Sequence, residues 1–160
     1  MIESKISGLA LDVTTNSPVV TITPTDSEKI LPIWIGHYEA WAISMEISGI
    51  ASKRPLTHDL LLTVVESLKG RVDRIEIVDL KEQTFYAEIS ISLNGEIIKI
   101  DARPSDSLAL ALKAKAPIFV NENLYNLKKE QMEQSGLPDQ ESLRDRLRKI
   151  DPEDFGHYKL

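Results

Sequence analysis

An Asn-Gly pair between two alternating runs is the feature that most constrains the fold of this chain. Residues 84–93 alternate apolar and polar side chains, Asn94-Gly95 follows, and residues 96–102 alternate again. Because Asn and Gly tolerate positive φ, this pattern predicts a two-residue type I′ hairpin. A two-residue turn also fixes the strand register, which places Ile91 opposite Ile98.

This register gives the predicted hairpin one apolar face and one polar face. The apolar pairs, which we expect to be buried, are Ile91–Ile98, Ile89–Ile100 and Ala87–Ala102. On the polar face Glu88 lies opposite Asp101, and like charges across a strand pair are destabilising. Two explanations stay open. Both carboxylates point to water with Lys99 and Arg103 as diagonal neighbours, or a divalent cation lies between them, since hard cations bind carboxylate oxygens.

The remaining sequence predicts more strands and several helices. The strands are expected over residues 2–13, 18–23, 30–35, 72–80 and 117–120, and the helices over 37–47, 57–68, 105–112, 121–127 and 141–150. The second helix is expected to carry one apolar stripe; its residues are Leu60, Leu61, Val64, Val65 and Leu68. These elements predict an α+β fold with a mixed, mostly antiparallel sheet and helices packed against it.

Two short segments of the chain are repeated approximately. Residues 32–35 (Pro-Ile-Trp-Ile) are similar to residues 117–120 (Pro-Ile-Phe-Val), and an Arg-Pro pair precedes a predicted helix at both 54–55 and 103–104. Either the chain contains a duplicated strand-helix unit or the matches arise by chance.

Length and composition indicate one globular domain. The 160 residues suit a domain over 1–127, followed by a charged C-terminal tail over 128–160 with a short helix. Few apolar residues occur in the tail, so we expect the fold to survive its removal. The chain has no cysteine, which excludes disulfides and thiolate zinc sites and suits the cytoplasm. Neither a signal peptide nor an apolar run near the roughly 20 residues of a membrane span is found.

Charge and motifs narrow the classes of function. The net charge of -6 argues against tight, sequence-independent binding of nucleic acid and favours chemistry that uses carboxylates. Residues 54–59 (Arg-Pro-Leu-Thr-His-Asp) offer His58 as a general base and Asp59 as its orienting group or a metal ligand. A structural interpretation is also open, in which Thr57 caps the helix and Asp59 complements its dipole. Glu39, in the first turn of an earlier helix, has the same two interpretations.

A second polar segment covers residues 101–106 (Asp-Ala-Arg-Pro-Ser-Asp). Asp101 and Arg103 are two residues apart on a predicted strand and so share a face. Ser105 and Asp106 lie at a helix N-terminus, where backbone amides can hold a phosphate. Capping explains these last two residues but leaves Asp101 and Arg103 unexplained. The sequence contains no phosphate-binding glycine loop, zinc-protease helix or nucleophile elbow.

The chain resembles the bifunctional nuclease family. The resemblance covers the chain from its start to about Tyr125, and its segments are residues 31–36 with 39–40, 54–60, 84–87, 101–107 and 117–120. One minor departure is Ser107, where the family often has alanine. The resemblance implies an α+β fold, a homodimer, and a nuclease acting on DNA and RNA.

These observations lead to the hypothesis of a metal-dependent nuclease. Its candidate catalytic residues are His58, Asp59, Arg103 and Arg54, its candidate metal ligands are Asp101, Asp106 and Glu88, and its candidate substrate-binding residues are Ser105, Glu39 and Thr57. The expected cofactor is a divalent cation such as Mg or Mn. The alternative is a non-catalytic, dimeric binding or regulatory module. Apolar residues on more than one side of the first helix, Trp41, Ile43 and Met45, support a homodimer.

Overall fold

A computed structural model describes residues 1–127, 132, 134 and 136–150. Its strands are β1 (Ile2–Asp12), β2 (Ser17–Pro24), β3 (Leu31–Trp34), β4 (Arg71–Lys81), β5 (Thr84–Leu93), β6 (Glu96–Ala102), β7 (Ile118–Val120) and β8 (Leu147–Lys149). Its helices are α1 (His37–Ile47), α2 (Thr57–Ser67), α3 (Pro104–Ala114), the 3-10 helix η1 (Glu122–Asn126) and α5 (Gln140–Arg146). The predicted α+β class is confirmed.

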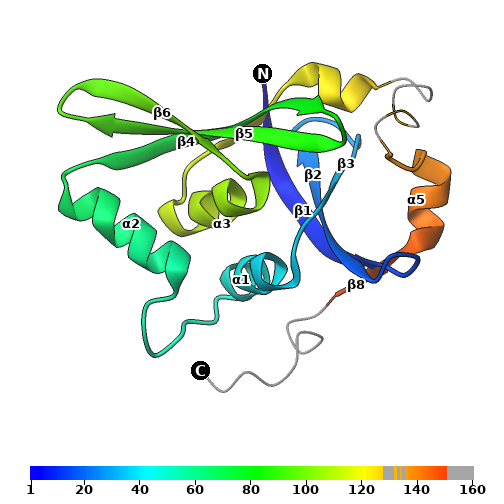
Figure 1. The fold of residues 1–160 in the computed structure, drawn as a ribbon, viewed down its shortest axis with the longest axis horizontal. Coiled ribbons are helices and arrows are strands. Elements are labelled where there is room, and N and C mark those ends of the chain that lie inside the picture. The colour runs from blue at the N-terminus through cyan, green and yellow to red at the C-terminus, as the bar shows by residue number, and fades with distance from the viewer. Residues whose placement is uncertain (128–131, 133, 135, 151–160) are drawn as a thin grey trace.

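The strands form one sheet in the order β3-β2-β1-β7-β4-β5-β6, and β8 pairs with the end of β1 (Figure 1). Strands β4 and β7 are parallel, and the other pairs are antiparallel. Hence the sheet is mixed and mostly antiparallel, as predicted. The two similar tetrapeptides take different positions, since β3 is an end strand and β7 lies in the middle of the sheet.

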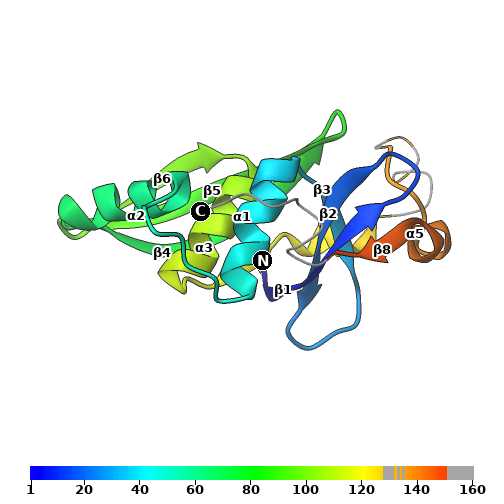
Figure 2. The ribbon, with the colours of Figure 1, turned by 90° about the horizontal axis from the view of Figure 1, so that it is seen from below.

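Helices α1, α2 and α3 form a layer on one face of this sheet (Figures 1 and 2). The core between them contains Ile22, Ile75 and Ile77 from the strands and Ile43 and Leu108 from α1 and α3. Ile43 and Met45 are buried inside the domain and cannot contribute to a dimer surface, whereas Tyr38 and Ile47 of α1 are exposed. Two of the three residues on which the predicted dimer surface rested are thus core residues.

The hairpin register is confirmed. Glu88 pairs with Asp101 and Ile91 with Ile98, and Asn94 and Gly95 both have positive φ, as a type I′ turn requires. However, burial of the whole apolar face was wrong, because Ile98 and Ile100 are about two-fifths exposed. These residues lie on the end strand β6, beyond the part of the sheet that the described helices cover.

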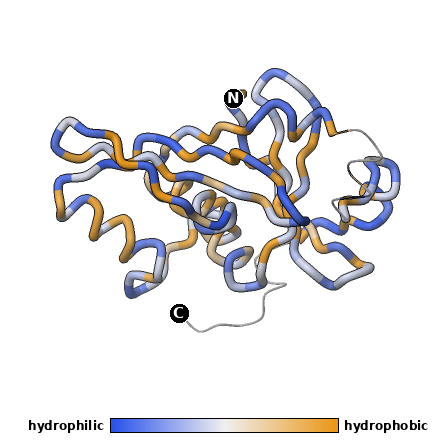
Figure 3. The backbone as a smooth tube through the Cα atoms, turned by 45° about the horizontal axis from the view of Figure 1, so that its top comes forward, coloured by the Kyte–Doolittle hydropathy of each residue, from blue (hydrophilic) through white to orange (hydrophobic). Residues whose placement is uncertain are grey.

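Helix α2 carries the predicted apolar stripe, and most of that stripe is exposed. Leu62 and Val65 pack against the core. The exposed members, between 42% and 66% exposed, are Leu60, Leu61, Val64 and Leu68. Figure 3 shows hydrophobic colouring along α2, at the end of the molecule that also holds β6. The sequence pattern found the apolar face but could not show that it lies outside the domain core.

The C-terminal segment packs on the far end of β1. The predicted helix over 141–150 is instead α5 followed by β8, whose residues pair with Ala10, Leu11 and Asp12. Leu143 and Ile150 are buried. The segment thus buries more apolar surface than its charged sequence suggests. Phe155, another apolar residue of the C-terminal tail, lies outside the described residues.

Candidate active site

The site is built where three helices begin. Glu39 lies in the first turn of α1, His58 in the first turn of α2 and Asp106 in the first turn of α3. Pro104 is the first residue of α3, where its fixed φ suits a helix start and its missing N–H loses no bond. Arg103 immediately precedes it. Because α1 and α2 both pack beside α3, the three first turns lie together.

Four of the predicted residues form one contact network, which we call the His58 cluster (Glu39, His58, Arg103 and Asp106). The Nε2 atom of His58 lies 3.0 Å from Oδ1 of Asp106. Arg103 donates from Nε to the other oxygen of Asp106 at 2.7 Å, and its Nη2 atom lies 2.9 Å from Glu39 Oε1. The side chain of His58 is only 11% exposed, while that of Arg103 is 65% exposed. The imidazole is therefore held inside and the guanidinium at the surface.

The contacts of Asp106 fix the charges in this cluster. Burial alone would raise the pKa of Asp106, but hydrogen bonds from Arg103 and His58 outweigh burial and lower it. Asp106 is therefore an anion at neutral pH and accepts the Nε2–H of His58. The Nδ1 atom of His58 has no hydrogen-bond partner among the residues that the structure describes. This arrangement leaves Nδ1 as the proton acceptor of a His-Asp pair.

A pocket of about 500 Å³ opens beside the cluster, a volume typical of small-molecule sites. It is lined by Tyr38, Glu39, Trp41, Ala42, Pro55, Leu56, Thr57, His58, Arg103 and Asp106. The pocket thus contains all four residues of the His58 cluster together with apolar walls. This position gives a ligand access to the imidazole and the guanidinium at once.

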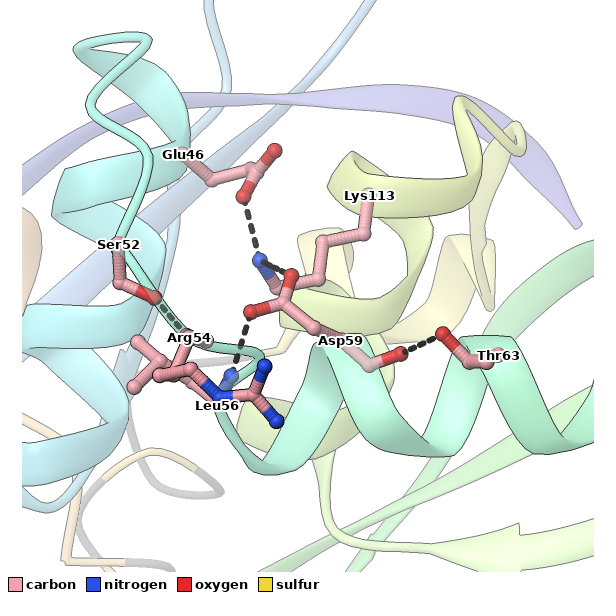
Figure 4. A network of polar contacts seen from close by, with 7 residues as sticks. All are labelled: Glu46, Ser52, Arg54, Leu56, Asp59, Thr63 and Lys113. Carbon is pink, nitrogen blue, oxygen red and sulfur yellow. Dashed lines mark hydrogen bonds and ion pairs between the residues drawn. The ribbon is translucent and has the colours of Figure 1, made fainter.

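The second residue of the predicted His-Asp pair takes a different partner. Asp59 accepts a hydrogen bond from Lys113 Nζ at 2.5 Å and one from the Leu56 backbone N–H at 2.8 Å. Lys113 also binds Glu46 at 2.7 Å, so it lies between two carboxylates (Figure 4). Burial would raise the pKa of Asp59, but the bonds from Lys113 and Leu56 lower it. Asp59 therefore fixes the start of α2 and does not orient His58.

Sequence reasoning missed Lys113, although a signal was present. Asp106 and Lys113 are seven residues apart on α3 and therefore lie on the same face, about 10.5 Å apart along the axis. The adjacent residues of α2 contact these two side chains: His58 contacts Asp106, and Asp59 contacts Lys113. These two contacts fasten the first turn of α2 across two turns of α3, which sets the position of His58.

Two further candidates lie around this turn. Thr57 is the first residue of α2 and lines the same pocket as His58, but it does not cap the helix, because Leu56 occupies the cap position. Arg54 lies in the loop before α2 and lines a second pocket of about 480 Å³, which also contains Lys53, Lys113 and His58. In Figure 4 its guanidinium makes none of the contacts drawn. Arg54 is thus near the site but is not part of the His58 cluster.

The predicted metal ligands are separated by the structure. Glu88 and Asp101 lie opposite each other on β5 and β6, and Glu88 binds Lys99 at 2.8 Å. Lys99 also contacts the buried Glu76, so this lysine offsets the negative charge of two glutamates. The arrangement is similar to the first explanation, in which Lys99 neighbours the opposed carboxylates. Asp106 instead faces α2. Among the residues that the structure describes, no group of three His, Asp or Glu side chains could hold a metal ion.

The last candidate, Ser105, does not line the pocket beside the His58 cluster. It is 6% exposed and lines another pocket, of about 470 Å³, which also contains Arg103. Neither Ser105 nor Asp106 caps α3, whose cap position is occupied by Arg103 without a side-chain hydrogen bond. The predicted capping roles were therefore wrong. Arg103 is the side chain that the two pockets share.

Comparison with known proteins identifies the family. Residues 20–133 match the sequence profile of the bifunctional nuclease domain. The chain belongs to this family. The matched range contains the whole His58 cluster, whereas all of β1, α5 and β8 lie outside it. No helix in the part of the chain that the structure describes has the length and apolar character needed to cross a membrane.

Individual relatives fall into two groups. An uncharacterized protein of Mycobacterium tuberculosis is 42% identical over 120 residues, which cover 75% of this chain and 71% of that protein. Bifunctional nuclease 1 of Oryza sativa subsp. japonica is 25% identical over 104 residues, covering 62% of this chain and 31% of the plant protein. Bifunctional nuclease 2 of Arabidopsis thaliana is 24% identical over 112 residues, which cover 68% of this chain and 34% of that protein. The chain thus spans about a third of these plant proteins.

Proposed function

We propose that this protein is a nuclease that hydrolyses phosphodiester bonds of DNA and RNA at the His58 cluster. The observation that carries the proposal is the contact of His58 with an ionised Asp106 that Arg103 also binds, beside an open pocket. Membership of the bifunctional nuclease family and the names of the plant relatives support the choice of substrate. The cysteine-free composition favours the cytoplasm as the place of action.

The chemistry follows from the hydrogen bonds. Asp106 accepts the Nε2–H of His58, so the lone pair of Nδ1 is free to take a proton from an attacking water. The water oxygen bonds to phosphorus as the bond to the leaving sugar oxygen breaks, and that oxygen takes a proton from solvent. Negative charge builds on the phosphoryl oxygens during this step. Arg103 uses Nε and Nη2 for Asp106 and Glu39, which leaves other N–H groups of its guanidinium for those oxygens. Glu39 positions Arg103, and Asp106 positions His58.

The divalent cation predicted from the sequence, Mg or Mn, does not match a prepared set of ligands here. Asp106 is bound to a guanidinium and an imidazole, and Glu88 is bound to Lys99. The described carboxylates therefore do not converge on a common point. The proposed reaction therefore uses no metal ion, and a requirement for Mg or Mn is a separate hypothesis. Cleavage measured with Mg or Mn and with excess chelator tests this requirement: equal rates would reject it.

We also propose a homodimer, formed by the exposed apolar residues of α2 and β6. Those on β6 are Ile97, Ile98 and Ile100, and those on α2 are Leu60, Leu61, Val64 and Leu68. In the described sheet β6 pairs only with β5, so its other edge offers free backbone groups. Two copies related by a two-fold axis can pair these edges antiparallel and cover the apolar residues.

The same surface favours a second candidate function, a non-catalytic dimeric binding or regulatory module. Isolated exposed apolar residues are common, but a group from two elements at one end of a molecule marks an interaction surface. This candidate would use the polar pocket only to bind a ligand. It predicts binding without turnover, which the cleavage assay distinguishes directly.

The test is cleavage of end-labelled single-stranded DNA and RNA by the purified protein. The proposal predicts that wild type cleaves and that His58→Gln, prepared in parallel, is at least about 100-fold slower, the scale of losing a general base. Equal cleavage by both preparations would assign the activity to a contaminant or to another site. Binding of the oligonucleotides with no cleavage by wild type would favour the second candidate.

A further inference from the structure

The pocket that contains Ser105 shares Arg103 with the pocket beside His58. We call it the Ser105 pocket, and its main walls are Trp34, Phe85, Arg103, Ser105 and Leu137. Its volume is about 470 Å³, and Arg103 is the only charged side chain among its described lining residues. Arg103 is paired with Asp106 and Glu39, but other N–H groups of its guanidinium stay available in the pocket. These donors can bind an anionic ligand.

The start of α3 supplies donors for such a ligand. Pro104 has no N–H, and the first N–H with a backbone acceptor is that of Ser107, which bonds to the Arg103 carbonyl at 3.0 Å. The N–H groups of Ser105 and Asp106 have no acceptor within the described residues, and no side chain caps this helix. Free amides at the N-terminus of an 11-residue helix attract an anion.

The hydroxyl of Ser105 is an independent sign of a ligand. The residue is 94% buried, because its relative exposure is 6%. Its hydroxyl makes no hydrogen bond to the described residues and is not fully enclosed, so it can donate to a ligand in the pocket. Its remaining exposed surface faces the pocket that it lines. The neighbouring Ser107, in contrast, is completely buried and donates to the Arg103 carbonyl at 3.0 Å.

The walls of the pocket suggest what carries the anion. Trp34 and Phe85 are both half-buried and line the pocket, and aromatic rings offer stacking surfaces to nucleobases. A hydrogen bond from the Trp34 indole N–H to Asp12 at 2.9 Å fixes that ring. A phosphate group at one end and a base at the other would use both parts of the pocket.

We infer that the Ser105 pocket binds a nucleotide through its terminal phosphate monoester. The free amides of α3, the Ser105 hydroxyl and Arg103 hold the phosphate, and Trp34 and Phe85 contact the base. The choice of a nucleotide rests on the proposed nuclease function. Because Arg103 lines both pockets, a bound strand would place its terminal phosphate here and the next phosphodiester beside His58. The pocket would thereby direct cleavage to strand ends that carry a phosphate.

Binding is tested without any cleavage, by NMR titration of ¹⁵N-labelled protein with deoxyadenosine monophosphate. The backbone N–H signals of Ser105 and Asp106 are expected to shift most. Deoxyadenosine, which lacks the phosphate, and inorganic phosphate, which lacks the base, are each expected to bind at least about ten times more weakly. Equal binding of the nucleoside would overturn the phosphate site. Equal binding of inorganic phosphate would overturn the role of the aromatic walls.

Variants localise the site. Ser105→Asp places a carboxylate in the pocket and should weaken nucleotide binding at least about ten-fold, while Ser27→Asp adds the same charge on an exposed loop and should leave it unchanged. If Ser105→Asp fails to fold, Ser105→Ala should still bind several-fold more weakly. Retained binding in a folded Ser105 variant would refute the inference. His58→Gln should bind the nucleotide normally, so loss of cleavage and loss of binding are separable failures.

Discussion

Asp12 is a completely buried carboxylate, and its balancing charge comes from the C-terminal segment. Arg146, the last residue of α5, donates to both of its oxygens, at 2.7 and 3.3 Å. Trp34 and the Thr14 backbone N–H donate as well. Burial alone would raise the pKa of Asp12, but these bonds outweigh it and lower the pKa from 3.8 to about 2. The contacts therefore stabilise the charged form in the folded state.

The lowered pKa of Asp12 sets the size of its contribution to folding stability and the direction in which that contribution changes with pH. A decrease of nearly two pKa units corresponds to roughly 2 kcal/mol of folding free energy. Because the folded-state pKa lies below the unfolded one, this stability is present above about pH 4 and is lost as the pH falls through about 2. Replacing Arg146 removes the cation but leaves the buried carboxylate. Breaking a buried pair in this way costs about 3–5 kcal/mol.

The experiment compares Arg146→Met with Arg144→Met, which changes an exposed arginine of the same helix. Urea denaturation at pH 7 should show Arg146→Met less stable by about 3 kcal/mol, equivalent to a melting temperature about 6–12 °C lower. Arg144→Met should lie within about 0.5 kcal/mol of wild type. If the two variants are equally stable, Arg146 does not fasten the C-terminal segment to β1 and the reasoning fails.

Three further predictions concern stability and association. Truncation after Leu127 removes β8 and the Arg146 contact, and it should lower the melting temperature by more than about 8 °C in calorimetry; a smaller change would show a dispensable tail. Lys113→Met leaves two partly exposed carboxylates unpaired and should cost about 1–2 kcal/mol in urea denaturation, whereas an unchanged midpoint would contradict its role. Wild type should be a dimer by light scattering, and Ile98→Lys with Leu61→Glu should be a monomer; a monomeric wild type at high micromolar concentration rejects the dimer.

Local patterns predicted the hairpin because its turn residues and its alternation act over a few residues. The same patterns could not predict burial on α2 and β6. An apolar stripe such as Leu61 and Val64 has the same sequence whether it contacts the core or a second copy. The strand β8 was missed because its pairing with β1 depends on residues more than 130 positions apart.

The sequence predicted which residues are candidates for the site, but it did not predict which of them lie together. His58, Arg103 and Asp106 were recognised, yet Asp106 was placed with Asp101 and Glu88 as a metal ligand. The chain turns at Pro104 from the sheet into the helix layer, so Asp101 and Asp106 face different surroundings. Although Asp101 and Asp106 are only five residues apart, this short separation does not show that they face different parts of the structure. The partners of Asp106 come from α2 and the cap of α3, and only the packed structure shows them together.

The most direct measurement of the central claim is the single-turnover cleavage rate of Asp106→Asn beside that of Asp101→Asn. Both changes replace a carboxylate by an amide of the same shape, and both can be compared at one saturating protein concentration. If the His58 cluster is the active site, Asp106→Asn loses at least about 100-fold, because His58 is no longer held in its reactive tautomer, and Asp101→Asn stays within about two-fold of wild type. A large loss in Asp101→Asn with normal cleavage by Asp106→Asn would contradict the account and place the chemistry on the outer face of the sheet.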